Sequence, residues 1–198
     1  PGFNVWRAKK LKEEVGVPVI AVGRFTEPSL ADEVIARGEA DLVAFGRQFL
    51  ADPDFLIKAR EGRPEDIRKC IACNQGCIER LMLGEGKIRC AINPETGPEI
   101  LSPQRPPDVR CNVWVVGAGP GGLIAAYEAA RLGHKVTLFE KEEETGGQLR
   151  LARKVPFKDQ YGIWASWLTD QAKKMGVILR TGIEVTEGMI SEGKPEVV

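Results

Sequence analysis

This sequence of 198 residues has almost no histidine and no excess of positive or negative charge. It contains one histidine, His134, and its 28 Lys and Arg residues equal its 28 Asp and Glu residues. A single imidazole, with no Ser/His/Asp or Cys/His set, argues against acid–base catalysis by histidine. The balanced charge, without a long block of one sign, gives no reason to expect nucleic acid or an anionic membrane as a partner. No apolar run approaches the ~20 residues that a membrane-spanning helix needs.

Cysteine is also scarce, but four of the five cysteines lie close together. Segments of two, three and twelve residues separate Cys70, Cys73, Cys77 and Cys90. Three thiolates in so short a stretch can surround one corner of a compact inorganic core, and soft ligands in this number suit an iron–sulfur cluster. A zinc site, which more usually shows two separated C-x2-C pairs, is the alternative. The grouping also favours a reducing cytoplasm over a disulfide framework.

The first third of the chain has the pattern of a parallel α/β array. Polar, helix-like segments alternate with short apolar runs that fit buried parallel strands. The expected order is helix, strand, helix, strand, over residues 4–15, 17–22, 28–37 and 41–45. Because parallel strands need crossover connections, we expect one parallel sheet with helices packed on it.

Both of these expected strands end in the same dipeptide. Gly23-Arg24 follows the first strand, and Gly46-Arg47 follows the second. Glycine lets a ligand approach the backbone, and arginine offers a planar fork of donors to phosphate oxygens. Loops after neighbouring strands of a (β/α)8 barrel often bind phosphate. The spacing alone leaves open the alternative that both arginines form surface ion pairs.

A dinucleotide fingerprint follows a proline-rich stretch at residues 93–110, which has the composition of a domain boundary. A strand expected over 112–116 leads into G-x-G-x-x-G, and then a helix and a strand over 135–139 follow. The fingerprint glycines and the acid that ends the second strand are Gly117, Gly119, Gly122 and Glu140. In this βαβ context, glycine permits a tight turn at a pyrophosphate, and the acid accepts hydrogen bonds from ribose.

Two more glycines and a further helix and strand follow Glu140. Gly146 and Gly147 allow a second close approach of the backbone to the same cofactor. The apolar pattern predicts a helix over residues 158–175, a strand over 177–186 and the start of another strand at 196–198.

The order of the motifs points to a family. Five motifs occur in a fixed order: VPVIAVGRF, ADLVAFGRQFLADPD, CIACNQGC with Cys90 after twelve intervening residues, VVGAGPGGL and FEKEEETGGQL. The sequence resembles, over essentially its whole length, the family of 2,4-dienoyl-CoA reductase and trimethylamine dehydrogenase, the NADH:flavin oxidoreductases whose front half is similar to old yellow enzyme. The resemblance implies an α/β chain with three parts. These are the C-terminal part of an FMN-binding (β/α)8 barrel at 1–62, an iron–sulfur segment and linker at 63–110, and a truncated Rossmann-like FAD/NAD(P)-binding domain at 111–198.

The resemblance also implies roles for individual residues. Gly23 and Arg24 match the phosphate-binding end of barrel strand seven, and Gly46 and Arg47 match that of strand eight. Four residues match the ligands of a [4Fe–4S] cluster, namely Cys70, Cys73, Cys77 and Cys90. The pyrophosphate turn, the ribose acid and a flavin-domain contact match Gly117, Gly119, Gly121, Gly122, Glu140 and Gln148.

For the intact enzyme, the resemblance implies that electrons pass from NAD(P)H through FAD and the cluster to FMN, which reduces an activated C=C bond of a small molecule such as a dienoyl-CoA or an enoate. An amine dehydrogenase with ADP in the second domain is one alternative, and a non-catalytic electron-transfer or nucleotide-binding module is another. The family's catalytic residues and six of its eight barrel strands lie upstream. We therefore expect an internal fragment that is inactive alone.

Overall fold

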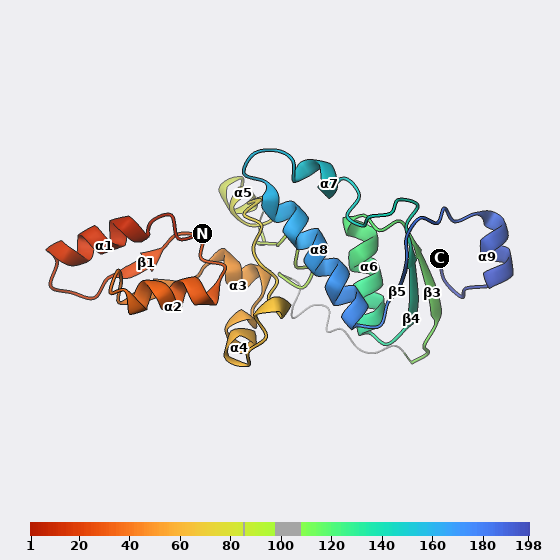
Figure 1. The fold of residues 1–198 in the computed structure, drawn as a ribbon, viewed down its shortest axis with the longest axis horizontal. Helices are drawn as coiled ribbons and strands as arrows, with labels where there is room; N and C mark the ends of the chain where they lie inside the picture. The colour runs from red at the N-terminus through yellow and green to blue at the C-terminus, as the bar shows by residue number, and fades with distance from the viewer. Residues whose placement is uncertain (85, 98–107) are drawn as a thin grey trace. The chain divides into compact units, whose positions relative to one another are not determined.

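The chain forms two compact units, Pro1–Ser102 and Pro103–Val198. The structure is a computed structural model, and it describes residues 1–84, 86–97 and 108–198 (Figure 1). The division falls in the predicted linker at residues 93–110, of which residues 98–107 lie outside the described part. None of the helices in the described ranges combines the length and the apolar character that a bilayer crossing requires.

The first unit is built on two parallel strands, as the sequence predicts, although both are shorter than expected. β1 (Ile20–Val22) pairs with β2 (Leu42–Ala44), with Ala21 opposite Val43. The two long helices on either side of β1 are α1 (Val5–Glu14) and α2 (Pro28–Ala36). Shorter helices follow β2: α3 (Arg47–Ala51), α4 (Phe55–Arg60), the 3-10 helix η1 (Pro64–Asp66) and α5 (Ile78–Met82).

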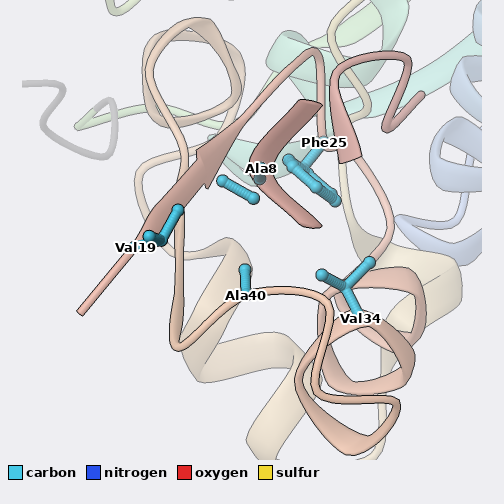
Figure 2. Packing of buried hydrophobic residues seen from close by; sticks show 6 residues of the cluster. Ala8, Val19, Phe25, Val34 and Ala40 are labelled. Atoms are coloured by element: carbon cyan, nitrogen blue, oxygen red, sulfur yellow. The ribbon is translucent and has the colours of Figure 1, made fainter. Parts of the chain in front are cut away.

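Alanine, valine and phenylalanine side chains form the core between these strands and helices. Figure 2 shows this cluster, which contains Ala8 of α1, Ala21 of β1, Val34 of α2, and Val19, Phe25 and Ala40 from the segments beside them. Removal of this apolar surface from water holds α1 and α2 onto the sheet.

A second apolar contact holds the short helices at the end of β2. The ring of Phe55, which is fully buried, lies 4.8 Å from that of Phe45 and 4.9 Å from that of Phe49. Because Phe45 follows β2 and Phe49 belongs to α3, this packing fixes the start of α3 beside the strand end.

The second unit contains a parallel sheet in the order β3–β4–β5, as the fingerprint context predicts. Its strands are β3 (Asn112–Val116), β4 (Lys135–Phe139) and β5 (Ile178–Arg180), and its helices are α6 (Pro120–Arg131), α7 (Leu149–Ala152), α8 (Asp159–Lys174) and α9 (Glu187–Gly193). In Figure 1, α6 and α8 lie on one side of this sheet and α9 lies on the other. The predicted α/β class with parallel sheets is therefore confirmed in both units.

The order of this sheet reverses at β3. Val197 forms a parallel bridge with Val113 on the edge of β3 that β4 does not occupy, and the Trp114 amide donates to the Val197 carbonyl at 2.9 Å. The residue pairing supports the expected strand start at 196–198. Open α/β sheets bind ligands at such a reversal, beyond the carboxyl ends of the strands.

The strand expected over 177–186 is wrong in its second half, and the sequence did not predict α9. β5 ends at Arg180, Gly182 adopts a left-handed backbone with φ +69°, and Thr186 caps α9 by accepting a hydrogen bond from the Met189 amide at 3.3 Å. The glycine and the threonine cap are local signals that prevail over the alternating apolar pattern.

The contact between Gly122 and the end of β3 generates a test of the fold. A Cβ atom at residue 122 would lie 1.9 Å from the Gly117 carbonyl oxygen, whereas a Cβ atom at residue 121 would meet nothing within 4 Å. We expect Gly122→Ala to lower the free energy of unfolding of the second unit by about 1–3 kcal/mol through overpacking. Gly121→Ala, the matched control, should cause no loss of stability.

Urea unfolding followed by tryptophan fluorescence measures this difference, because Trp114, Trp164 and Trp167 all belong to the second unit. Equal unfolding midpoints for the two variants would contradict the contact.

Candidate cofactor sites

A pocket of about 190 Å³ lies at the carboxyl ends of β1 and β2. Arg24 and Arg47 both line it, together with Gly46 and Cys70. The structure thus brings three of the four residues predicted for a phosphate site into one pocket, and it adds the first of the four grouped cysteines.

Gly23 has a different reason to be glycine from the one that the sequence suggested. A Cβ atom at residue 23 would lie 3.1 Å from the Asn4 backbone nitrogen, and the Gly23 carbonyl accepts a hydrogen bond from the Gly2 amide at 2.7 Å. The absent side chain therefore makes room for the start of α1, and the described lining of the pocket does not include Gly23.

The two arginines reach the pocket from different backbone conformations. Arg24 has a left-handed backbone with φ +54°, which costs free energy for any residue with a Cβ atom. Arg47 is the first residue of α3, and its Nη1 donates to the Oδ1 of Asn74, which lies between the second and third grouped cysteines. A Cβ atom at Gly46 would meet nothing within 4 Å, so the backbone between the strand and α3 is open.

The four grouped cysteines are partly buried and act on one another electrostatically. Burial raises the pKa of the Cys70 thiol; the Ala72 amide and Arg47 lower it, and the thiols of Cys73 and Cys77 raise it further.

The same forces act on Cys90. Burial raises the pKa of its thiol most, the amides of Ile92 and Asn93 lower it, and the thiols of Cys70 and Cys73 raise it. Burial outweighs the nearby N–H groups and the guanidinium, so the net pKa of both thiols is raised. Four thiols that interact with one another are the soft donor set that an iron–sulfur group uses. Within the described ranges, no three His, Cys, Asp or Glu side chains form a group that could hold one metal ion. The ligand role of the cysteines remains a prediction from their spacing.

Gly76 allows the segment with Cys90 to lie against the loop with Cys77. A Cβ atom at residue 76 would lie 2.7 Å from the Arg89 carbonyl oxygen, and the Arg89 amide donates to the Gly76 carbonyl at 2.6 Å. This contact holds the segment with Cys90, thirteen positions after Cys77, against the loop of the other cysteines, and Cys90 interacts there with Cys70 and Cys73.

Buried polar side chains attach the cysteine segment to α3, and sequence reasoning missed them. Gln48, which is 2% exposed, accepts a hydrogen bond from the Cys70 amide at 3.0 Å and donates to the Arg68 carbonyl at 3.1 Å. Asp52, which is 3% exposed, accepts from the Arg68 amide at 2.8 Å. The only signal in the sequence is their i, i+4 spacing, which places Gln48 in the short helix α3 and Asp52 directly after its last residue.

Asn93 connects the far end of the cysteine segment to the same helix. It is 3% exposed, and its Nδ2 donates to the Leu50 carbonyl at 3.0 Å, to which Thr96 also donates at 2.6 Å. Its Oδ1 accepts from the Arg68 guanidinium at 2.7 Å. Both ends of the segment therefore depend on polar groups of α3.

In the second unit, the fingerprint glycines divide into three kinds. Gly117 has a φ of +97°, a backbone conformation that side chains rarely allow, at the turn after β3. Gly122 gives close packing of α6 on the end of β3, where a Cβ atom would overlap the Gly117 carbonyl. Gly119 and Gly121 have open space where a Cβ atom would lie, at the N-terminus of the twelve-residue α6. Such a cradle, which a side chain would fill, fits the pyrophosphate of a dinucleotide.

Glu140 is buried and supports this turn. One carboxylate oxygen accepts from the Ala118 amide at 2.6 Å, and the other accepts from the Glu142 amide at 3.1 Å. Each oxygen of a carboxylate has two lone pairs, so each retains capacity for a ribose hydroxyl. The ribose role of Glu140 stays a prediction, and its support of the Gly-rich turn is an observed contact.

The second glycine pair lies directly on the fingerprint. The Gly146 amide donates to the Ala118 carbonyl at 2.7 Å, and a Cβ atom at Gly147 would lie 3.0 Å from the Gly119 α-carbon. Gly147 therefore joins the predicted site. Gln148 precedes α7 with an exposed side chain, and its predicted contact with a flavin stays a prediction.

Comparison with known proteins finds a separate family match in each of the two compact units. Residues 3–66 match the NADH:flavin oxidoreductase / NADH oxidase family, and residues 115–176 match the NAD(P)-binding Rossmann-like domain. The NADH oxidase of Thermoanaerobacter brockii is 41% identical over 198 residues, which are 100% of this chain and 30% of that protein.

Two solved structures have the same fold. The structure of 2-naphthoyl-CoA reductase in complex with 2-naphthoyl-CoA matches with a TM-score of 0.93 and 33% identity, covering 100% of this chain and 30% of that one. Histamine dehydrogenase from Rhizobium sp. 4-9 matches with a TM-score of 0.83 and 34% identity, covering 93% of this chain and 27% of that one. The chain thus spans about 30% of the length of these relatives. Its motifs, its fold and these matches place it in the NADH:flavin oxidoreductase / NADH oxidase family.

Proposed function

We propose that this chain is part of a flavin oxidoreductase that passes electrons from NAD(P)H through FAD and a [4Fe–4S] cluster to FMN, for the reduction of an activated C=C bond in a small molecule. The observation that carries the proposal is the pocket at the ends of β1 and β2, which Arg24, Arg47 and Cys70 line together. When bound, the flavins and the cluster supply the hydride and one-electron chemistry, and the protein supplies binding and position.

In the first unit, the two arginines would bind the FMN phosphate. They present two guanidinium groups at neighbouring strand ends, where N–H donors can pair with phosphate oxygens. Cys70, Cys73, Cys77 and Cys90 would hold the cluster. Since Cys70 lines the same pocket, a cluster ligand would lie beside the flavin phosphate, so the cluster and FMN would be neighbours in this unit.

In the second unit, the open backbone at Gly119 and Gly121 would bind the pyrophosphate of FAD or ADP, with Gly147 packed beside it. The match to an NAD(P)-binding Rossmann-like domain supports a dinucleotide here. Both nucleotides share a pyrophosphate and a ribose, so the absorption spectrum of the extracted nucleotide is the measurement that separates them.

The similarity to 2-naphthoyl-CoA reductase favours a reductase that acts on an unsaturated acyl-CoA or a related acid. The similarity to histamine dehydrogenase favours the second candidate, an amine dehydrogenase with ADP in the second unit. Turnover of an enoyl-CoA with NAD(P)H, compared with turnover of a small amine with an artificial electron acceptor, distinguishes the two.

The grouped cysteines and the balanced charge support a small-molecule substrate and a cytoplasmic location.

The cysteines generate the first functional prediction. We expect the anaerobically prepared whole protein to contain about four irons and four sulfides. Substitution of Cys70, Cys73, Cys77 or Cys90 by serine should remove most of both. Cys111→Ser is the matched control and should retain both. Iron, acid-labile sulfide and visible absorption measure the outcome. Stoichiometric zinc without sulfide would show that the site is a zinc site.

The Gly-rich turn of the second unit generates the second functional prediction. Gly119→Val should abolish binding of FAD and ADP, because the new side chain would occupy the open space where the pyrophosphate lies. Gly119 has a φ of −70°, which valine also adopts, so the free energy of unfolding should not change. The control is Gly16→Val, at an exposed turn of the first unit with open space around it. Calorimetric titration with each nucleotide checks this, and unchanged affinity in the Gly119→Val variant would refute the turn assignment.

The arginines generate the third. Arg24→Ala and Arg47→Ala should each weaken FMN binding to the whole protein by about 1.5–3 kcal/mol, the cost of losing a hydrogen bond to a charged group. Arg37→Ala, which removes an exposed arginine paired with Glu33 on α2, should leave FMN affinity unchanged. FMN fluorescence quenching gives the dissociation constants, and equal values for all three variants would exclude a phosphate role.

A further inference from the structure

We infer that Asn74 is a positioning residue that couples the two cofactor sites of the first unit, so that cluster binding raises FMN affinity through the Asn74–Arg47 hydrogen bond. The inference rests on the proposed function, since it takes the pocket as the FMN phosphate site and the grouped cysteines as cluster ligands. It adds an energetic dependence of one site on the other.

The side chain of Asn74 joins the cysteine loop to the pocket. Its Oδ1 accepts a hydrogen bond from Nη1 of Arg47, over a separation of 27 residues in sequence. Arg47 lines the pocket together with Arg24. A guanidinium has five N–H donors, so Arg47 can bind Asn74 and still present donors to a phosphate.

The backbone of Asn74 is held by the turn that carries the third cysteine. Its carbonyl oxygen accepts from the Cys77 amide at 3.3 Å and from the Glu79 amide at 3.0 Å. Its φ of +64° is left-handed, and Ala72 on the other side of Cys73 is also left-handed with φ +55°. A loop with two such residues needs other interactions to hold it in this shape, and metal–thiolate bonds from Cys70, Cys73 and Cys77 would supply them.

The coupling follows from restriction of Arg47. Asn74 and the Arg47–Asn74 bond are solvent-exposed, so a free Arg47 side chain would lose rotamer freedom on binding phosphate. When the cluster fixes the loop, Asn74 already holds the guanidinium, and less ordering remains for FMN to impose. By thermodynamic linkage, bound FMN must stabilise the cluster by the same factor.

The experiment compares FMN dissociation constants of the whole protein before and after removal of the cluster by an iron chelator. Asn74→Gly is the main variant, because glycine tolerates the left-handed backbone and only the carboxamide is lost. Gln75→Ala is the matched control, since it deletes an exposed carboxamide one residue further along.

In the wild type and in Gln75→Ala, cluster removal should weaken FMN binding by about fivefold, the effect of one exposed hydrogen bond. The Asn74→Gly variant should bind FMN about fivefold more weakly with the cluster present, and cluster removal should then change its affinity little. A purely structural role for Asn74 would not remove the dependence on the cluster.

Reciprocally, FMN should slow iron loss to the chelator in the wild type and have no such effect in Asn74→Gly. If Asn74→Gly does not retain its cluster, the FMN affinity of Asn74→Asp is measured instead. Its carboxylate would form an ion pair with Arg47 and weaken FMN binding, so wild-type affinity in that variant would overturn the inference.

An equal effect of cluster removal in Asn74→Gly and the wild type would also overturn it. Flavin, iron and sulfide contents of the wild type are measured first, and their absence would mean failure of the proposed function instead.

Discussion

The buried carboxamide of Gln48 and the carboxylate of Asp52 determine where the cysteine segment lies. That segment has little regular structure, so its own backbone hydrogen bonds do not fix its path. Instead, the Cys70 amide donates to Gln48 of α3, and the Arg68 amide donates to Asp52, which directly follows α3. Buried polar groups need their partners, and loss of either acceptor would leave a backbone donor unsatisfied. Because α3 also carries Arg47, this attachment brings Cys70 and Arg47 into the same pocket.

In the second unit, close packing at glycines, in place of buried polar side chains, positions the cofactor-binding turn. Gly122 brings α6 against the end of β3, and Gly147 brings a later loop against Gly119. The Glu140 carboxylate then fixes the turn through the Ala118 amide. The result is a helix N-terminus with exposed backbone at the point where the sheet order reverses, which is where an anionic nucleotide group is stabilised by unpaired N–H groups.

The pocket of the first unit gives the proposed electron transfer a physical setting. Arg24, Arg47 and Cys70 line one pocket of about 190 Å³, so a single set of short elements would determine the relative position of the proposed phosphate site and the proposed cluster ligand. Any change at α3 would then act on both. The hydrogen bond between Arg47 and Asn74 joins the pocket to the cysteine loop, so it connects the two proposed sites directly.

The sequence by itself determined the class of this protein and its candidate groups. Apolar periodicity predicted the parallel α/β units, and the cysteine spacing and the Gly-rich turn predicted cofactors, because these signals are local. It failed for residues 181–186, where Gly182 and a threonine cap ended a strand that apolar pattern alone would have continued. Only the tertiary structure decided that Gly23 makes room for Asn4 and that residues as distant as Arg47 and Asn74 meet. Such contacts depend on the path of loops whose shape is set by buried hydrogen bonds and close packing, and no local pattern encodes that path.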